Sequence, residues 1–388
     1  MIVLKNAYLL EEKKTVDIKI DDGIIVEIAD NIPEEGVDLA GKILCRGLID
    51  MHTHLREPGF EYKETIETGI NAAIAGGYSA VCPMPNTNPV CDNLQTLEFI
   101  KSKANGFNIF PICAVTKKLT TDELTDIKTL KQAGAIAFSN DGKPVSDLSV
   151  LKEALQKDEL IISHAEIMEL NGTAQSEYKA VEQELEVLRK TGGKYHFAHI
   201  STKESIELIR NAKKEGLNIT CETAPHYFVL TNEQVNSNPI FKVNPPLRQE
   251  EDRLAVIEAL KDGTIDVIAT DHAPHALDEK KQAYQCAPMG LVGLETALAL
   301  SLTYLKDVMQ IDEILNKFTI NPAKILGINN FGEIKIGNKA NLAVIDVDKK
   351  WVVDAQKFQS KCKFSPFDGM NLQGKAVKTI VNGVIYDN

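Results

Sequence analysis

The chain has 388 residues, of which 44% are hydrophobic and 25% charged, and its formal net charge at pH 7 is −12. This length exceeds one average domain and suffices for a barrel of about 250 residues together with a second, smaller domain. The negative charge argues against nucleic acid or an anionic membrane as the main partner, although a single arginine or metal ion can still attract an anionic substrate into a pocket.

The cysteines and the first residues indicate the compartment. Seven cysteines are scattered along the chain without a C-x-x-C pair, which is typical of reduced thiols in a cytoplasmic protein. The first twenty residues lack the apolar core and cleavage site of a signal peptide. The sequence contains no run of about 18 apolar residues, so we expect no transmembrane helix. We therefore expect a cytoplasmic protein that binds neither membranes nor nucleic acid.

Both ends of the chain carry short β-strand patterns. Residues 1–45 contain several apolar runs, and Asp21-Asp22-Gly23 between two of them is a hairpin signal. Residues 334–388 contain further runs of the same kind, with Asn382-Gly383 as a second turn signal. We expect one small β-domain assembled from 1–45 and 334–388, and a central domain over 46–333.

The central domain alternates strand-like and helix-like patterns. Four of the expected helices cover Glu64–Ala75, Asp122–Ala133, Lys203–Glu215 and Glu250–Lys261. Eight apolar runs mark the strands: Ile43–Met51, Ser79–Met84, Ile109–Val115, Ala135–Phe138, Leu160–Ile162, Tyr195–Ile200, Ile219–Glu222 and Val267–Thr270. Eight such units predict a closed (β/α)8 TIM-like barrel of the α/β class. The alternative is an open doubly wound sheet, which more often has a glycine-rich phosphate loop after its first strand, and none is present.

Potential metal ligands follow the ends of these strands. His52 and His54 are two residues apart at the end of the first strand, so both side chains point to the same face and form half of a metal site. Taken alone, an H-x-H pair is weak, because it also fits two polar residues in a loop. Four further strand ends add ligands, and the expected set is His52, His54, Asp141, His164, His199 and Asp271.

In a closed barrel these ends converge on one pocket, where four imidazoles and two carboxylates can hold two divalent ions. Of the other histidines, His275 also lies at a strand end. His226 could line the pocket, but a hydrogen-bonded loop histidine is the favoured interpretation. We expect His196 to be structural, and His272 to point away from the metals because it neighbours Asp271.

Arg56 lies two residues beyond His54 and could bind a substrate carboxylate through a bidentate fork. The other possibility is an ordinary surface arginine. The stretch from Ala276 to Cys286 is rich in charged residues and follows the last strand, so we expect a mobile loop over the site.

Four motifs give the sequence a specific resemblance. They are Asp50-Met51-His52-Thr53-His54-Leu55-Arg56-Glu57-Pro58-Gly59, Pro83-Met84-Pro85-Asn86-Thr87-Asn88-Pro89, Ala269-Thr270-Asp271-His272-Ala273-Pro274-His275 and residues 287–296. The chain resembles the dihydroorotases of the amidohydrolase superfamily, in their longer bacterial class, over essentially its whole length. The resemblance implies a TIM-like barrel with a β-sandwich built from both termini, and two zinc ions per subunit.

The resemblance also implies roles for particular residues. Many relatives bridge the metals with a carboxylated lysine, whereas the longer class uses an aspartate, which is Asp141 here; Lys143 lies beyond Gly142 in the loop. The expected substrate contacts are made by His54, Arg56, Asn86, Asn244, His275, Met289 and Gly290. The family's usual phenylalanine is replaced by Met289, which weakens the assignment of that position.

The implied reaction is the reversible cyclisation of N-carbamoyl-L-aspartate to L-dihydroorotate in pyrimidine (UMP) biosynthesis. The mechanism is a binuclear metal-hydroxide attack with Asp271 as the general acid and base. Alternatives are another cyclic-amide hydrolase, of the allantoinase or dihydropyrimidinase type, and a non-catalytic protein of the same fold. A homodimer and an association with aspartate transcarbamoylase are expectations from the family that the residues themselves do not test.

Overall fold

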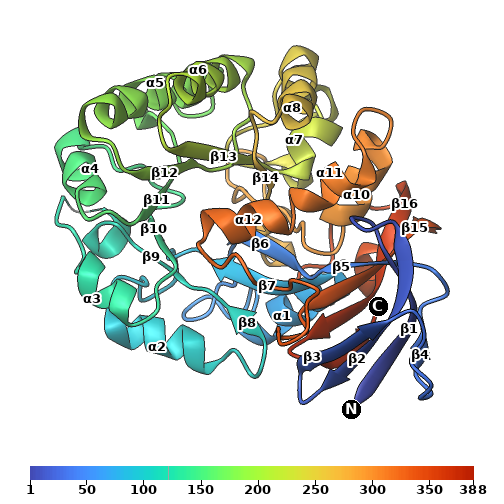
Figure 1. The fold of residues 1–388 in the computed structure, drawn as a ribbon. Coiled ribbons are helices and arrows are strands. Elements are labelled where there is room, and N and C mark those ends of the chain that lie inside the picture. The colour runs from blue at the N-terminus through green and yellow to red at the C-terminus, as the bar shows by residue number, and fades with distance from the viewer. Residues whose placement is uncertain (121) are drawn as a thin grey trace.

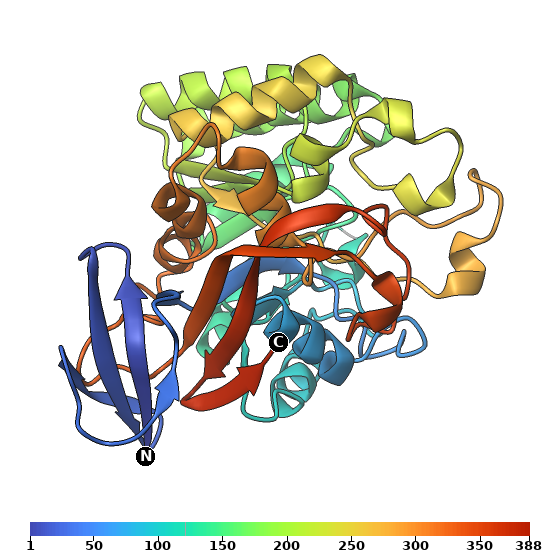
Figure 2. The same cartoon turned by 90° about the vertical axis from the view of Figure 1, so that its right-hand side faces the viewer.

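A computed structural model describes residues 1–120 and 122–388. It places a ring of strands, surrounded by helices, beside a separate sheet in which the first and last parts of the chain lie together (Figure 1). Figure 2 shows the same arrangement from the side, with the N-terminal and C-terminal strands next to each other. None of the helices in the described residues is long and apolar enough to cross a membrane.

The ring is a barrel of parallel strands in which the third strand is split in two. Its strands are β6 (Leu48–Thr53), β7 (Tyr78–Pro83), β8 (Asn108–Ile109), β9 (Ile112–Cys113), β10 (Ala137–Ser139), β11 (Leu160–Ser163), β12 (Lys194–Phe197), β13 (Ile219–Thr223) and β14 (Val267–Ile268). Parallel pairs run from β6 to β8 and from β9 to β14. The barrel closes through a parallel bridge between Thr53 and His272 and a hydrogen bond of 2.8 Å from the His54 amide to the His272 carbonyl.

Helices surround this barrel and follow most of its strands. The helices are α1 (Ile66–Ala75), α2 (Leu94–Ser102), α3 (Ile127–Gln132), α4 (Leu148–Leu155), α5 (Ala174–Thr191), α6 (Lys203–Lys214), α7 (Pro225–Val229), α8 (Glu250–Asp262), α9 (Leu277–Lys280), α10 (Ala297–Leu305), α11 (Ile311–Asn316) and α12 (Ile320–Ile325). Single 3-10 turns are η1 (Lys117–Leu119), η2 (Met168–Leu170), η3 (Asn232–Gln234), η4 (Pro239–Phe241) and η5 (Ala355–Lys357). The (β/α)8 prediction is therefore confirmed.

Side-chain caps decide where the expected helices begin. The Thr65 side chain accepts a hydrogen bond from the Thr68 amide, so α1 starts at Ile66 and not at Glu64. The predicted helix from Asp122 is wrong in its first turn. Asp126 caps α3, and the Thr125 amide donates to the Val115 carbonyl, which holds Thr125 against the end of the third strand.

The second unit is an eight-stranded sheet made from both ends of the chain. Its strands are β1 (Ile2–Leu9), β2 (Lys14–Asp21), β3 (Ile24–Ala29), β4 (Val37–Asp38), β5 (Ile43–Arg46), β15 (Leu342–Val352), β16 (Asn371–Val381) and β17 (Val384–Asp387). The order is β17-β16-β15-β5-β1-β2-β3, and β4 pairs with β1. Strand β5 is antiparallel to β15, and this pairing joins the two ends.

Three hydrophobic clusters stabilise this arrangement. One fills the barrel interior, including Met51, Ala198 and Val267, and another lies mainly between the barrel strands and the surrounding helices. The third lies within the terminal sheet, around Ile18 and Val344. Burial of these apolar side chains is the main stabilising term of both units.

Candidate metal centre and active site

The six predicted ligands all lie at the carboxyl ends of barrel strands. His52 belongs to β6 and His54 follows it, and Asp141, His164, His199 and Asp271 come shortly after β10, β11, β12 and β14. All six side chains are buried. His199 and Asp271 have φ angles of +34° and +47°, a region that non-glycine residues rarely adopt. Such strained backbone is concentrated at functional sites, where the surrounding structure holds it in place.

Five of these residues form two groups that can each hold a metal ion. One group is His52, His54 and Asp141, and the other is Asp141, His164 and His199. Within each group the potential ligand atoms lie within 4.8 Å of one another. Asp141 belongs to both groups, so its carboxylate can bridge two ions.

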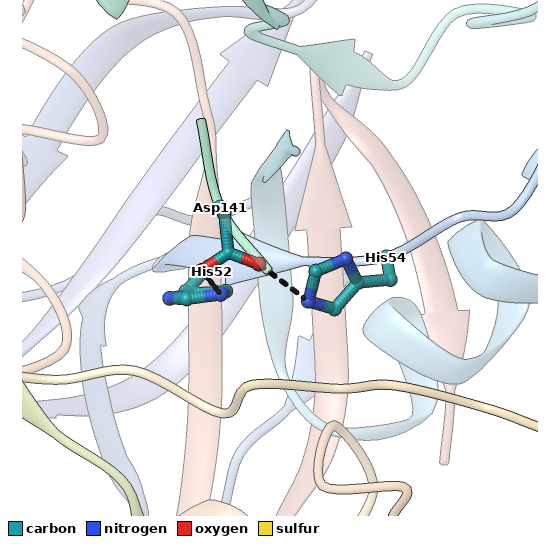
Figure 3. A group of neighbouring side chains, drawn as sticks. All are labelled: His52, His54 and Asp141. Atoms are coloured by element: carbon teal, nitrogen blue, oxygen red, sulfur yellow. Dashed lines mark ion pairs between the residues drawn. The ribbon is translucent and has the colours of Figure 1, made fainter. Parts of the chain in front are cut away.

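The two carboxylate oxygens of Asp141 face different histidines. Oδ1 lies 3.3 Å from His52 Nε2 and 3.5 Å from both His164 Nδ1 and His199 Nε2. Oδ2 lies 3.4 Å from His54 Nε2. Figure 3 shows Asp141 between His52 and His54. This division is the arrangement that a bridging ligand requires.

Two atoms of the centre show that the residues fit bound cations. His52 Nε2 and Asp141 Oδ1 are fully buried and have no hydrogen-bond partner among the described residues. Leaving such atoms unsatisfied costs free energy, which coordination to a metal removes. Imidazole nitrogens and carboxylate oxygens are also the ligands that divalent zinc accepts.

Asp271 stands at the edge of this centre in its ionised form. Its Oδ1 lies 3.2 Å from His54 Nε2 and 3.6 Å from His52 Nε2. Burial alone would raise the pKa of Asp271, but the hydrogen bond from His54 and the charges of neighbouring histidines hold it well below its usual range. A buried carboxylate that stays ionised here can bind a metal ion and accept a proton.

Sequence comparisons decide the family to which this centre belongs. The amidohydrolase family model matches residues 43–386. The dihydroorotase of Acetivibrio thermocellus is 44% identical over 417 aligned positions, covering 98% of both proteins. That of Ruminiclostridium cellulolyticum is 42% identical and covers 98% of this chain and 97% of the relative.

The chain belongs to the dihydroorotases of the amidohydrolase family.

Solved structures agree on the fold. The L-hydantoinase (dihydropyrimidinase) of Arthrobacter aurescens has a TM-score of 0.91 at 25% identity, covering 100% of this chain and 96% of that one. The D-hydantoinase (dihydropyrimidinase) of Thermus sp. has a TM-score of 0.85 at 23% identity. These neighbours confirm a TIM-like barrel with a β-sandwich built from the termini.

In this member of the dihydroorotase family, three of the predicted substrate contacts lie together beside the metal centre. Arg56 Nε donates to the Pro274 carbonyl at 3.0 Å, and its Nη2 lies 3.3 Å from His275 Nε2. His275 Nε2 lies 2.8 Å from the Met289 carbonyl and donates to it. Burial and the charge of Arg56 lower the pKa of His275 to about 2, so this imidazole is neutral.

Asn86 and Asn244 are bound to metal-ligating histidines. Asn86 Oδ1 accepts from His54 Nδ1 at 2.9 Å, and Asn244 Nδ2 lies 3.1 Å from His164 Nε2. Gly290 follows Met289, and its amide donates to the Lys242 carbonyl at 2.9 Å. A Cβ on Gly290 would lie 2.6 Å from the Ala273 carbonyl oxygen, so this close approach requires glycine.

The three remaining histidines, His196, His226 and His272, have different surroundings. The side chains of His196 and His272 lie 3.2 Å and 3.5 Å from the carboxylates of Glu222 and Glu64, and among the described residues neither side chain pairs with a predicted ligand, as expected. The interpretation of His226 as a hydrogen-bonded loop histidine is wrong. It lies in α7, is buried, and its Nε2 has no hydrogen-bond partner among the described residues. Burial lowers its pKa to about 4.

Sequence reasoning missed two carboxylates behind the histidines. Glu222 Oε1 lies 2.7 Å from His52 Nδ1, and Glu166 Oε2 lies 3.1 Å from His164 Nε2. Burial would raise the pKa of Glu222, but hydrogen bonds from His196 and His52 bring it down to about 2. The only charged residue of strand β13 was the available signal for Glu222, and the H-x-E spacing was the signal for Glu166.

The segment from Ala276 to Cys286 is not a bare loop. It contains α9, in which the Lys280 side chain is 3% exposed and donates to the carbonyls of Pro239 and Lys242. Glu279 pairs with Lys63 at 3.0 Å. Some of the charged side chains in this segment therefore form hydrogen bonds or ion pairs with other parts of the protein. The movement of the segment over the site stays a prediction.

Proposed function

We propose that this protein catalyses the reversible cyclisation of N-carbamoyl-L-aspartate to L-dihydroorotate, with two zinc ions held by His52, His54, Asp141, His164, His199 and Asp271. The observation that carries the proposal is the shared Asp141 carboxylate between two ligand groups, with Arg56 beside them. The names of the relatives at 42–44% identity support the same reaction.

Bound divalent ions supply the acidity that the reaction needs, by lowering the pKa of water and polarising an amide carbonyl. The protein groups carry out the remaining steps. In the hydrolytic direction water adds to the ring amide carbonyl, and Asp271 accepts the proton. The C–N bond then breaks, and Asp271 returns the proton to the leaving nitrogen. In the synthetic direction the same carboxylate takes a proton from the ureido nitrogen.

The substrate carries a carboxylate that does not react, and we assign it to Arg56 with Asn86 and His275, whose single N–H would turn from the Met289 carbonyl to the substrate. The guanidinium is held in place because Nε is bound to the Pro274 carbonyl, which leaves its outer nitrogens for the ligand. Burial lowers the pKa of Arg56 to about 10, so the group remains charged at neutral pH. We place the substrate ring near Asn244 and the Met289-Gly290 backbone.

We propose Asp141, and not Lys143, as the bridging ligand. The Asp141 side chain is buried between the two ligand groups, whereas Lys143 is exposed in the loop beyond Gly142. An aspartate is ready to coordinate as soon as it is ionised, while a lysine must first be carboxylated.

The net charge of −12 disfavours nucleic acid and anionic membranes as partners, whereas a local arginine can still bind a small anionic substrate.

The seven cysteines are all free thiols, which supports a cytoplasmic location. The sheet order supports residues 1–45 and 334–388 as one domain and 46–333 as the other. A homodimer and a complex with aspartate transcarbamoylase remain proposals from the family.

The test is an assay of the zinc-loaded protein on L-dihydroorotate, dihydrouracil and hydantoin, with metal analysis of the same sample. We expect two ions per chain and a kcat/KM for dihydroorotate about a hundredfold or more above that for the two substrates without a carboxylate. Equal or higher activity on dihydrouracil would favour the dihydropyrimidinase alternative. Two bound ions with no activity on any of the three would favour a non-catalytic protein.

A further inference from the structure

A hydrogen-bonded chain runs through the barrel interior behind the metal centre. His52 Nδ1 lies 2.7 Å from Glu222 Oε1, and His196 Nε2 lies 3.2 Å from Glu222 Oε2. Thr220 Oγ1 lies 2.7 Å from His196 Nδ1. His52, Glu222 and His196 are all 1% exposed or less. The chain thus links the metal centre to a residue near the start of β13.

A glutamate in this position requires an explanation beyond packing. The interior of such barrels is usually filled by branched apolar side chains, and here the same interior contains Met51, Ala198 and Val267. A buried carboxylate is strongly unfavourable unless it is paired and hydrogen-bonded. Among the described residues, His52 and His196 are the two side chains that meet this condition for the Glu222 carboxylate, so its presence is tied to those two imidazoles.

The direction of each hydrogen bond follows from the chemistry of the groups. An ionised carboxylate accepts and never donates, so His52 must carry its proton on Nδ1 and His196 must carry one on Nε2. The Thr220 hydroxyl lies 2.7 Å from His196 Nδ1 and 3.5 Å from the Tyr195 carbonyl, and it can donate to either. His52 Nε2 is left with a free lone pair, and it is this atom that faces Asp141 at 3.3 Å and Asp271 at 3.6 Å.

We propose that Glu222 is a positioning residue that fixes the orientation and tautomer of His52 and thereby strengthens metal binding in the group formed with His54 and Asp141. The inference rests on the proposed two-ion function and extends it to a residue that touches neither ion nor substrate. The negative charge of Glu222 also makes the imidazole a stronger ligand, as carboxylates behind metal-bound histidines do generally.

The variant Glu222→Gln tests this role with little change in shape. The amide oxygen can still accept from His52, while the amide nitrogen faces His196. His196 can then move its proton to Nδ1 and donate to the Thr220 hydroxyl, which is able to accept. The variant therefore loses the charge while keeping a complete set of hydrogen bonds.

The matched control is Asp17→Asn in the terminal sheet. Asp17 is 3% exposed, accepts from the amides of Asn6 and Ile32 and pairs with Lys5, far from any metal ligand in the chain. The Asp17→Asn variant shows how the loss of a buried carboxylate affects the stability of the protein when no metal ligand is involved.

Zinc affinity is measured by competition with a chelating dye for the wild-type protein and both variants. We expect Glu222→Gln to weaken one of the two zinc equivalents by about tenfold or more, and Asp17→Asn to change neither by more than about twofold. Equal zinc affinities in wild type and Glu222→Gln would overturn the proposal. Wild-type protein that binds fewer than two ions would instead overturn the two-ion function.

A second measurement needs only the wild-type protein and does not depend on whether a variant folds. Histidine-selective nitrogen NMR of the zinc-loaded protein is expected to show His52 protonated at Nδ1 and coordinated through Nε2. A proton on Nε2 of His52 would contradict the positioning role of Glu222.

Discussion

Asp141 belongs to both potential metal-binding groups, and its two oxygens face different histidines. We predict that Asp141→Ala reduces the bound metal from two ions to fewer than one per chain and lowers kcat/KM for dihydroorotate by at least about a hundredfold. Lys143→Ala is the control and should keep both ions. Elemental analysis and a steady-state assay measure the two effects, and retention of both ions by Asp141→Ala would show that another group bridges them.

Arg56 tests whether substrate recognition depends on geometry or on charge alone. Lysine keeps the positive charge but cannot reproduce a planar fork, so Arg56→Lys should lower kcat/KM for dihydroorotate. Losing one charge-assisted hydrogen bond costs about 1.5–3 kcal/mol, which corresponds to about ten- to a hundredfold. Metal content should stay at the wild-type level because the ligands are unchanged.

Arg46→Lys provides the matched control for this substitution. Arg46 lies in β5 of the terminal sheet, where its Nη1 donates to the Asn329 carbonyl, and it is remote from the strand ends that carry the ligands. It should leave kcat/KM within about twofold of wild type. If Arg56→Lys behaves in the same way, the carboxylate of the substrate is bound elsewhere.

At the scale of elements, the sequence predicted best those features that depend on the residue pattern of a single strand. The apolar run before His52 and His54 predicts both the strand and the face of its ligands, because side chains alternate along a strand. Asp141 and Asp271 follow their strands in the same way. Such local patterns were enough to predict the barrel and the five residues that form the two potential metal-binding groups.

The features that were missed depend on contacts between distant segments. Glu222 is recognised as part of the site only when β13 is seen to place it against His52, 170 positions away in the chain. The segment after Asp271 has the composition of an exposed loop, yet Lys280 is buried because two carbonyls outside the segment accept its protons. Composition cannot show such partners.

The short helix α9 yields a prediction about this segment. Lys280→Met keeps an unbranched side chain that is one atom shorter but leaves the carbonyls of Pro239 and Lys242 without their donor, so the segment should be held less firmly. We expect faster amide hydrogen exchange over residues 276–286 and a KM for dihydroorotate raised by about three- to tenfold. The neighbouring Lys281→Met, at an exposed position, should change neither. Unchanged exchange in Lys280→Met would show that other contacts hold the segment.

At the scale of the whole molecule, the two units are joined by polar contacts as well as by the chain. The buried carboxylate of Glu64 accepts from the Ser360 hydroxyl and from the Lys361 amide. The Thr379 hydroxyl donates to the Ile74 carbonyl at the end of α1, and the Gln373 amide donates to Thr303 in α10. These contacts predict that the barrel and the terminal sheet unfold together.

Metal removal tests this coupling, because the ions bind the barrel while the only tryptophan, Trp351, lies in β15 of the terminal sheet. An ion present at a thousand times its dissociation constant stabilises the folded state by about 4 kcal/mol. Chelation should therefore lower the unfolding midpoint by on the order of 5–10 °C. Far-UV circular dichroism and Trp351 fluorescence should report the same shift. If chelation leaves the unfolding midpoint measured by Trp351 fluorescence unchanged, the two units unfold separately.

The pairing of β5 with β15 also sets the order in which this protein can mature. Strand β5 leaves the ribosome about 300 residues before its partner, which at 5–20 residues per second is a delay of roughly 15–60 s. During that interval the edge of β5 that faces β15 has no native neighbour and can pair with another chain, although its other edge already has β1. The barrel can begin to form around its ligands in the same period. The terminal sheet is therefore the last part of the molecule to be completed, and a polysome carrying many such chains is where aggregation would begin.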